Sequence, residues 1–155
     1  MTITLRPIAR VSNERKDLAD DEWGEVRSVI ELAADVDPES LTGLEDFSHV
    51  EVLFFFDRVA EAEVEHRARH PRGNVAWPRV GIFAQRGKNR PNRLGSCIAR
   101  VVKREGRALH VVGLDAIDGT PVVDIKPVMK EFLPRDPVRQ PAWSTELMRD
   151  YWSRD

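Results

Sequence analysis

The chain has 155 residues, 41% of them hydrophobic and 32% charged, which is typical of one soluble globular domain covering residues 1–155. No run approaches the roughly eighteen apolar residues of a membrane span, and the N-terminus (MTITLRPIAR) lacks the apolar stretch of a secretory signal. The single cysteine, Cys97, excludes an internal disulfide and predicts a cytoplasmic protein, while the net charge of −2 conceals a strong asymmetry along the chain.

The first half of the chain has mainly the patterns of strands. Alternating residues predict strands at 3–11 and 25–33, separated by an acidic loop ending in DDEWG, and 38–45 is predicted to be a helical turn. The clearest strand is 47–57, where four apolar side chains share one face: Val50, Val52, Phe54 and Phe56. Its other face becomes apolar at Leu53 and Phe55, so we expect another element or a partner subunit to cover it.

The second half continues with short strands and ends in a helix. Residues 58–79 are predicted to be irregular with one helical turn, and strands are predicted at 80–86, 97–103, 108–115 and 121–126. The turn REG pairs the 97–103 and 108–115 strands. Ser144 or Thr145 is predicted to cap a closing helix whose apolar stripe is Leu147, Met148, Tyr151 and Trp152. Many short strands without strand–helix alternation predict a mainly β protein, a small barrel with short peripheral helices.

Charge is distributed unevenly along the chain. Residues 66–104 contain eleven Lys and Arg and no Asp or Glu, so the rest carries 13 basic and 26 acidic residues and sums to −13. A segregated basic segment favours an anionic partner, of which nucleic acid is the commonest. The alternative is a solvated basic face with no partner.

The segment GIFAQRGKNRPNRLGSC (81–97) begins as an apolar run and continues as a basic loop. It does not fit a phosphate-binding loop, because five residues rather than four separate Gly81 and Gly87, and Asn89 stands where Ser or Thr would bind magnesium. His66 and His70 have no Cys or carboxylate at ligand spacing, so no metal site is predicted. Cys97 is predicted to be a small core residue rather than a nucleophile.

Three segments have the order and spacing of a known family. The loop just quoted resembles the pattern G-V-F-A-T-R-x-x-x-R-P-N-P-I-G-x-S, LEDFSHVEVLFFF (44–56) resembles an L-E-x-F-S-H strand, and GLDAIDGTPVVDIKP (113–127) resembles a closing signature. Together they resemble the TsaA-like, or TrmO-type, tRNA methyltransferases. The resemblance implies a six-stranded, non-Rossmann β-barrel that forms a homodimer, binds S-adenosyl-L-methionine and methylates N6 of threonylcarbamoyladenosine next to the tRNA anticodon. The extra C-terminal domain of longer members is expected to be absent.

The resemblance also implies which residues form the site. Arg86 would pair with the cofactor carboxylate or support the loop, Asn92 would recognise adenine or ribose, and Gly95 would allow a close backbone approach. Asp115 is the candidate general base, because a urea-like nitrogen is a poor nucleophile and a carboxylate that accepts its proton would help. The other expected cofactor contacts are Trp23, Gly24, Glu25, Asp57, Arg58, Ile98, Leu114, Ala116 and Ile117, with the backbone of 114–117 bonding adenine.

Several positions have alternative roles or depart from the family pattern. Trp23 is predicted to be a stacking surface or a dimer contact. Asp118 is compatible with a turn as well as a site, and Asp124 with an ion pair to Arg90 or Lys126. Arg93 stands where the pattern has proline, and we expect it to loosen the loop. The end of the 47–57 strand also differs, since many members have His-Gln where this chain has Asp57-Arg58.

A tRNA partner is expected to bind the basic segment through Arg90, Arg93, Arg100 and Lys103, with Arg93 pointing towards phosphate. Two other functions stay open on the sequence alone. One is a methyltransferase acting on another nucleoside or small molecule, and the other is a non-catalytic RNA-binding module.

Overall fold

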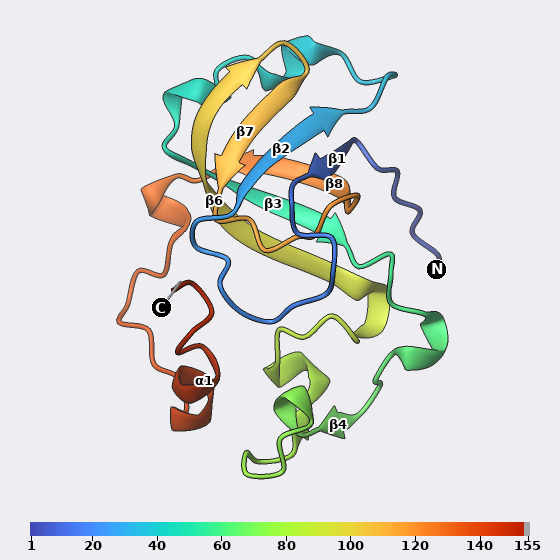
Figure 1. The fold of residues 1–155 in the computed structure, drawn as a ribbon, viewed down its shortest axis with the longest axis vertical. Helices are drawn as coiled ribbons and strands as arrows, with labels where there is room; N and C mark the ends of the chain where they lie inside the picture. Colours follow the sequence, from blue (N-terminus) through green and yellow to red (C-terminus); the bar gives the residue numbers. More distant parts are fainter. Residues whose placement is uncertain (154–155) are drawn as a thin grey trace.

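Alternating apolar residues close the antiparallel strands into a barrel (Figure 1). The computed structural model describes residues 1–153. Six strands form the closed barrel, in the order β1-β2-β7-β6-β3-β8. They are β1 (Ala9–Ser12), β2 (Arg27–Leu32), β3 (His49–Phe55), β6 (Leu94–Glu105), β7 (Ala108–Val112) and β8 (Pro121–Pro127). The predicted mainly β barrel, with six strands, is confirmed.

The barrel interior is formed by every second side chain of the strands. On β3, Val50, Val52 and Phe54 are at most 2% exposed, while the residues between them are half-buried on the outside. Across the β3–β6 ladder, Val50 lies opposite Ala99 and Val52 opposite Cys97, so both strands direct their apolar faces inward. The predicted inward face of the 47–57 strand and the predicted core position of Cys97 are therefore confirmed.

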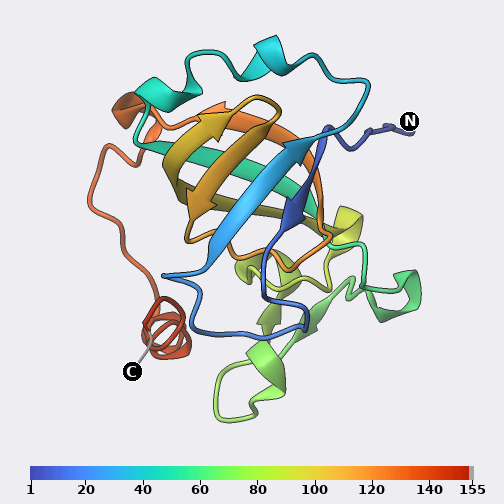
Figure 2. The ribbon, with the colours of Figure 1, turned by 45° about the horizontal axis from the view of Figure 1, so that its top comes forward.

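Elements outside the barrel are short. A two-stranded sheet joins β4 (Ala68–Arg69) to β5 (Val80–Gly81), and α1 (Ala142–Leu147) lies at one end of the barrel (Figures 1 and 2). The 3-10 turns are Pro38–Leu41, Leu44–Asp46, Glu61–Glu63, Pro71–Gly73, Ile82–Ala84, Pro91–Arg93 and Lys130–Phe132. The predicted helical turn at 38–45 is confirmed, whereas 58–79, predicted to be irregular with one helical turn, contains the short strand β4 and two 3-10 turns.

The strands predicted at 25–33, 47–57, 97–103, 108–115 and 121–126 are confirmed with adjusted ends, and the turn between β6 and β7 has Gly106 at φ +57°. The strand predicted at 3–11 is correct only from Ala9, because residues 1–7 are exposed and pair with no strand in the described chain. The strand predicted at 80–86 is wrong after Gly81. There the chain turns, burying Ile82 and leaving Phe83 76% exposed.

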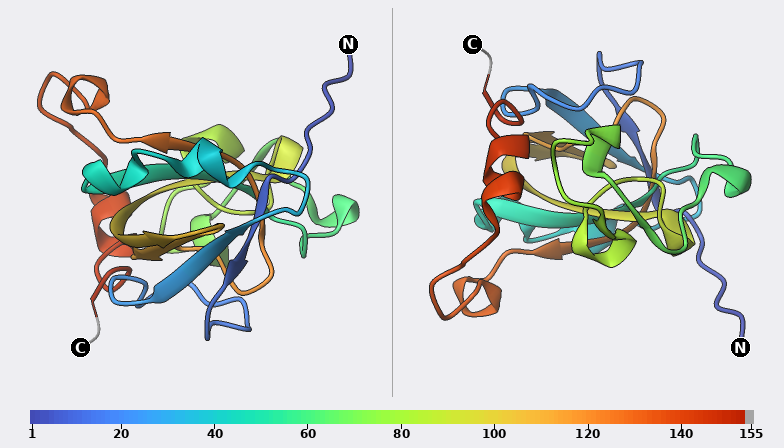
Figure 3. Two further views of the ribbon diagram at one scale, coloured as in Figure 1. Left: turned by 90° about the horizontal axis from the view of Figure 1, so that it is seen from above. Right: turned by 90° about the horizontal axis from the view of Figure 1, so that it is seen from below.

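The closing helix begins earlier and is shorter than predicted. It starts at Ala142 after Pro141, so neither Ser144 nor Thr145 is its cap, and the Ser144 hydroxyl instead donates to the Pro141 carbonyl at 2.7 Å. Because the helix ends at Leu147, Tyr151 and Trp152 of the predicted stripe lie in the turns that follow it. Figure 3 shows α1 on the side of the barrel away from the N-terminal segment.

Candidate functional site

Segments that are distant in sequence meet near α1: the loop 113–117 after β7, Cys97 of β6 with Arg86 of the loop before it, and residues 22–24 with the C-terminal segment 148–153 (Figures 1 and 2). Asp115 lies where these segments meet, and its carboxylate influences both Cys97 of β6 and Tyr151 of the C-terminal segment. This location brings together most of the residues expected from the sequence.

The loop 114–117 presents free backbone donors. Leu114, Ala116 and Ile117 are 0%, 3% and 8% exposed, so their side chains anchor the loop in the interior. Asn13 holds it from outside, since its side-chain amide donates to the Ala116 carbonyl at 2.8 Å. Within residues 1–153, the backbone N–H groups of Leu114, Ala116 and Ile117 make no backbone hydrogen bond, while that of Asp115 is directed at the Cys97 sulfur. Buried backbone donors are nearly always satisfied, so this loop is suited to bonding a ligand through its backbone.

Asp115 has two oxygens in different surroundings. Oδ2 accepts a hydrogen bond from the Tyr151 hydroxyl, whereas Oδ1 is buried and has no partner in the described chain. An unpaired buried acceptor is costly, which favours an N–H or O–H donor from a bound molecule at this point. Sequence reasoning found Asp115 but missed Tyr151, which was assigned only to a helical apolar stripe.

The groups around Asp115 are kept protonated. Burial, and then the charge of Asp115, raise the pKa of Tyr151 above its usual range. The same two causes raise the pKa of the Cys97 thiol, which donates to the Gly113 carbonyl at 3.3 Å. Cys97 is therefore a neutral donor in the core and not a thiolate nucleophile.

Arg86 lies within reach of this cluster and is only partly used. One of its Nη atoms donates to the Ser96 carbonyl at 2.8 Å, while the residue as a whole is exposed. Its charge also acts on Cys97 and Tyr151, which places it near the Asp115 side of the loop. Both roles expected for Arg86, loop support and pairing with an anionic ligand group, are compatible with this position.

The loop before β6 contains an unusual turn. Asn92 and Arg93 have φ +64° and +48°, the left-handed region that asparagine tolerates better than most residues. The Asn92 side chain is exposed and makes no hydrogen bond within residues 1–153. Gly95 has a packing role, because a Cβ there would lie 2.5 Å from the Phe54 ring. The close approach that Gly95 allows in this structure is therefore to the rings of Phe54 and Phe56.

Arg93 points back into the protein. Its guanidinium donates to the Val59 carbonyl at 2.6 Å and lies 4.8 Å from the centre of the Phe55 ring. These contacts hold the loop, contrary to the expectation that Arg93 would loosen it. A proline could not adopt φ +48°, because its ring fixes φ near −65°, so this turn differs from any that proline at this position allows.

Trp23 and its neighbours bind the C-terminal segment of the same chain. Trp23 is 3% exposed and packs with Val26, Ile117 and Tyr151, and the Arg15 guanidinium covers its ring at 4.0 Å. In this arrangement it has no open surface for stacking or for a dimer contact, in contrast to both predicted roles. Gly24 donates its N–H to the Trp152 carbonyl at 3.1 Å, and Glu25 is exposed.

Three other residues expected to contact the cofactor are Asp57, Arg58 and Ile98, and their side chains do not bond Asp115 in the described chain. Asp57 and Arg58 are exposed beyond the end of β3, and Arg58 donates to the Lys16 carbonyl at 2.6 Å. Ile98 is 46% exposed because it points outward between buried Cys97 and Ala99. Within residues 1–153, Asp57 and Arg58 make no bond to Asp115 or its neighbours, and Ile98 reaches them only through its carbonyl, 3.6 Å from the Cys97 sulfur.

The two aspartates with alternative predicted roles have structural partners. Asp118 accepts from the Asn13 N–H at 3.0 Å and pairs with Lys16 at 2.8 Å. These partners, Lys16 first, hold the pKa of Asp118 below its usual range. Asp124 pairs with Lys126 at 3.2 Å, which is one of its two predicted partners.

The basic segment divides into bonded and free residues. Arg90 donates to the Gln85 carbonyl at 2.7 Å, Lys103 pairs with Glu105, and Arg104 pairs with Glu45 at 3.7 Å. Within residues 1–153, four basic side chains of the segment make no hydrogen bond or ion pair: Arg67, Arg79, Lys88 and Arg100. Of the four RNA contacts expected from sequence, Arg100 is thus the one with an uncommitted charge.

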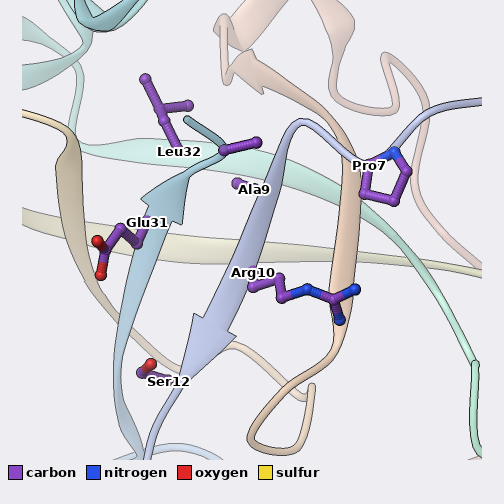
Figure 4. Close-up of a pocket in the computed structure, with 7 residues that line it drawn as sticks. Pro7, Ala9, Arg10, Ser12, Glu31 and Leu32 are labelled. Carbon is purple, nitrogen blue, oxygen red and sulfur yellow. The ribbon is translucent and has the colours of Figure 1, made fainter. Parts of the chain in front are cut away.

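A shallow hollow on the outside of β1 and β2 has no link to this cluster (Figure 4). It encloses about 310 Å³ and is lined by residues of β1 and β2 with the segments beside them, among them Pro7, Arg10 and Glu31. Among residues 1–153, no three His, Cys, Asp or Glu side chains are grouped to hold a metal ion. None of the helices in the described chain has the length and apolar character needed to span a bilayer.

Comparison with known proteins agrees with the motifs on this end of the barrel. Residues 20–132 match the family model of the tRNA-methyltransferase O N-terminal domain. The chain belongs to the tRNA-methyltransferase O family. A crystal structure of TrmO from Pseudomonas aeruginosa superimposes with a TM-score of 0.71 at 29% identity, covering 90% of this chain and 62% of that one.

Curated relatives of the tRNA-methyltransferase O family are longer than this chain. The tRNA (adenine(37)-N6)-methyltransferase of Homo sapiens is 42% identical over 111 residues, which cover 72% of this chain and 25% of the relative. The protein of the same name from Escherichia coli is 39% identical over 97 residues, covering 59% and 40%. A probable S-adenosyl-L-methionine-binding protein of Pyrococcus abyssi is 37% identical over 118 residues, covering 71% and 59%. The chain thus spans a quarter to three fifths of these relatives.

Proposed function

We propose that this chain is an S-adenosyl-L-methionine-dependent methyltransferase domain that acts on tRNA and methylates N6 of threonylcarbamoyladenosine beside the anticodon. The observation that carries the proposal is Oδ1 of Asp115, which is buried and has no partner within residues 1–153, beside the backbone N–H groups of Leu114, Ala116 and Ile117, which make no backbone hydrogen bond there. Both lie inside the segment that matches the tRNA-methyltransferase O domain.

The residues at this end of the barrel fit the cofactor. Adenine offers ring nitrogens that accept hydrogen bonds, which the N–H groups of 114–117 can donate. The free donors of Arg86 can pair with a carboxylate, and the exposed Asn92 amide can both donate and accept. When bound, S-adenosyl-L-methionine supplies a methyl group on a sulfonium leaving group.

The chain contributes alignment and a proton acceptor. Positioning the acceptor nitrogen about 3 Å from the methyl carbon provides much of the acceleration of an in-line displacement. The nitrogen must lose one proton as it gains the methyl group, and Oδ1 of Asp115 is an unpaired acceptor for that proton. Asp115→Asn keeps the shape and removes the base, so methyl transfer should fall about a hundredfold or more.

Two matched tRNA substrates test the proposal. Purified protein should transfer labelled methyl groups to tRNA that carries threonylcarbamoyladenosine and not to the same tRNA lacking the threonylcarbamoyl group. Transfer to neither, with cofactor binding by calorimetry, would instead favour another acceptor. Binding of tRNA with no cofactor binding would favour a non-catalytic RNA-binding module.

Cofactor recognition by the loop is tested at Asn92. Because this residue has φ +64°, Asn92→Gly removes the amide without backbone strain, whereas alanine would add strain. We expect micromolar affinity for S-adenosyl-L-methionine in the parent and loss of most of it in Asn92→Gly. Equal affinity in calorimetry would remove Asn92 from the site.

The tRNA surface is tested at Arg100, whose charge is uncommitted. Each phosphate contact releases counterions, so Arg100→Ala should lower the log–log salt slope of tRNA binding by just under one unit. Arg6→Ala is the control, since Arg6 is also exposed but lies outside the basic segment and pairs with Asp35. Equal slopes in parent and Arg100→Ala would exclude a phosphate contact there.

We also propose a two-fold homodimer. Leu53 and Phe55 face outward from β3, half-buried, and Ile98 on neighbouring β6 is 46% exposed. Such a face is stabilised by a second copy of the chain. A monomer mass in light scattering at micromolar concentration would contradict it.

A further inference from the structure

The C-terminal segment folds back against the site from outside the family match. Residues 142–153 follow the matched range of 20–132, yet three consecutive N–H groups hold the end of this segment. Glu22, Trp23 and Gly24 donate to the carbonyls of Asp150, Tyr151 and Trp152 at 3.1, 2.8 and 3.1 Å. The carbonyls of 150–152 follow α1 and have no partner in its hydrogen-bond ladder. The N–H groups of 22–24 therefore satisfy acceptors that would otherwise bond water.

Glycine at position 24 permits this contact. A Cβ at this position would lie 2.1 Å from the Trp152 carbonyl oxygen, which belongs to the backbone. Gly24 was expected from the sequence as a cofactor contact, and its close approach in the structure is to the C-terminal segment.

The docked segment places Tyr151 against Asp115. The tyrosine ring packs on Trp23, Val26 and Ile117, and its hydroxyl donates to Oδ2 of Asp115. Since its raised pKa keeps the hydroxyl protonated, it acts there as a donor. Asp115 and Tyr151 are 36 residues apart in sequence and meet only through the docking at residues 22–24.

The consequence is a carboxylate fixed at one oxygen and free at the other. Oδ1 is buried and unpartnered in the described chain, with Cys97 of β6 and Arg86 of the preceding loop as the other titratable groups nearby. The Cys97 thiol donates to the Gly113 carbonyl at 3.3 Å and also lies against the Asp115 carboxylate, whereas Arg86 donates to the Ser96 carbonyl at 2.8 Å. Within the described chain Oδ1 has no N–H or O–H partner, so it is available to accept a hydrogen bond.

We propose that Tyr151 is a positioning residue of this site, whose hydroxyl holds Asp115 so that Oδ1 accepts a hydrogen bond from the N–H group of a bound ligand. The proposal rests on the proposed methyltransferase function and extends the site beyond the family domain. The N–H donor belongs either to the cofactor or to the acceptor nucleoside, and these two sources have different kinetic consequences.

The test compares Tyr151→Phe with the parent protein in two measurements. If Oδ1 binds the cofactor, the dissociation constant of S-adenosyl-L-methionine in calorimetry should rise about tenfold. If it binds the acceptor, kcat for methyl transfer should fall about tenfold at saturating cofactor and tRNA, with cofactor affinity unchanged. Ser144→Ala is the control, because it removes another bonded hydroxyl of the same segment that does not contact Asp115.

A double-mutant cycle separates positioning from general stability. If Tyr151 acts through Asp115, Tyr151→Phe should have no further effect in the Asp115→Asn background, whereas a purely structural role gives additive losses. Gly24→Ala is the second variant, since it should displace Tyr151 without altering either partner and reproduce the loss.

The outcomes are distinct for the two proposals. Full cofactor affinity and full kcat in Tyr151→Phe, or additive losses in the cycle, overturn the positioning role and leave the methyltransferase function standing. A parent protein that binds no cofactor and transfers no methyl group overturns both.

Discussion

The barrel interior and the barrel end beside α1 differ in the polarity of their buried groups. In the interior, β3 presents Val50, Val52 and Phe54 at 2% exposure or less, and these apolar side chains contain no polar group to satisfy. At the end, Oδ1 of half-buried Asp115 is itself buried and has no partner within residues 1–153, and it lies on the loop 114–117 with its backbone N–H groups. The packed interior therefore makes the barrel rigid, and the polar groups at its end are available to bind a ligand. Binding sites are commonly built in this way, on loops that a rigid scaffold holds in place.

The two regions are joined at the start of β6. Gly95 allows the rings of Phe54 and Phe56 to pack where a Cβ would lie 2.5 and 2.8 Å away, and the rings meet edge to face with centres 5.3 Å apart. This contact fixes the loop that carries Arg86 and Asn92 to the core. The loop is therefore positioned by the interior although it contributes little to it.

The largest effect on the free energy of unfolding is expected in the interior. Phe54→Ala should lower the free energy of unfolding by about 3–5 kcal/mol, since Phe54 is 2% exposed and the change leaves a cavity. Phe83→Ala, at 76% exposure, is the matched control and should change it by less than about 0.5 kcal/mol. Urea denaturation followed by circular dichroism measures both, and similar losses would refute the contrast.

A smaller loss of stability is expected from Gly24→Ala, and it should be confined to the barrel end. Gly24→Ala places a Cβ 2.1 Å from the Trp152 carbonyl and should release the C-terminal segment, losing three hydrogen bonds at about 1 kcal/mol each. Gly81→Ala is the control, because its Cβ would meet nothing closer than 3.8 Å. Hydrogen exchange should quicken at residues 22–24 and not in β3. Unchanged exchange at 22–24 would mean that the docking is not formed.

In the loop before β6, a change that forbids the left-handed backbone should lower stability more than a change that only removes the Arg93 side chain. Arg93→Pro forbids φ +48° and should cost about 1–3 kcal/mol, while Arg93→Gly keeps that geometry and loses only the contacts to Val59 and Phe55. Thermal unfolding of the two variants gives the comparison. A proline variant as stable as the glycine variant would show that the left-handed turn is not required.

The smallest effect concerns pH. The pKa of Asp118 is lowered in the folded state by Lys16 and the Asn13 N–H, so the folded protein is stabilised above the ordinary aspartate pKa. That contribution is lost as the pH falls below the ordinary value and through the lowered one. Asp118→Asn should therefore flatten the acid limb of a stability–pH curve. An unchanged limb would show that these partners do not act in solution.

The sequence by itself determined much of the interior and the main loops. Alternation identified the buried face of β3, the REG turn located the β6–β7 hairpin, and Cys97 was correctly placed in the core. These predictions depend on residues close together in the chain, where a period of two or a turn residue has a direct structural meaning. The loop 114–117 and Asp115, by contrast, were expected as site residues because GLDAIDGTPVVDIKP resembles the closing signature of the family.

Only the tertiary structure decided how the end is assembled. The 80–86 run ends as a strand after Gly81, where the partner β4 has only two residues, and Arg93 turns towards Val59 across 34 residues of chain. Tyr151 reaches Asp115 because the amides of 22–24 hold the carbonyls after α1. Each of these contacts joins segments distant in sequence, and a local pattern contains no information about which distant donor will meet which acceptor once the barrel closes.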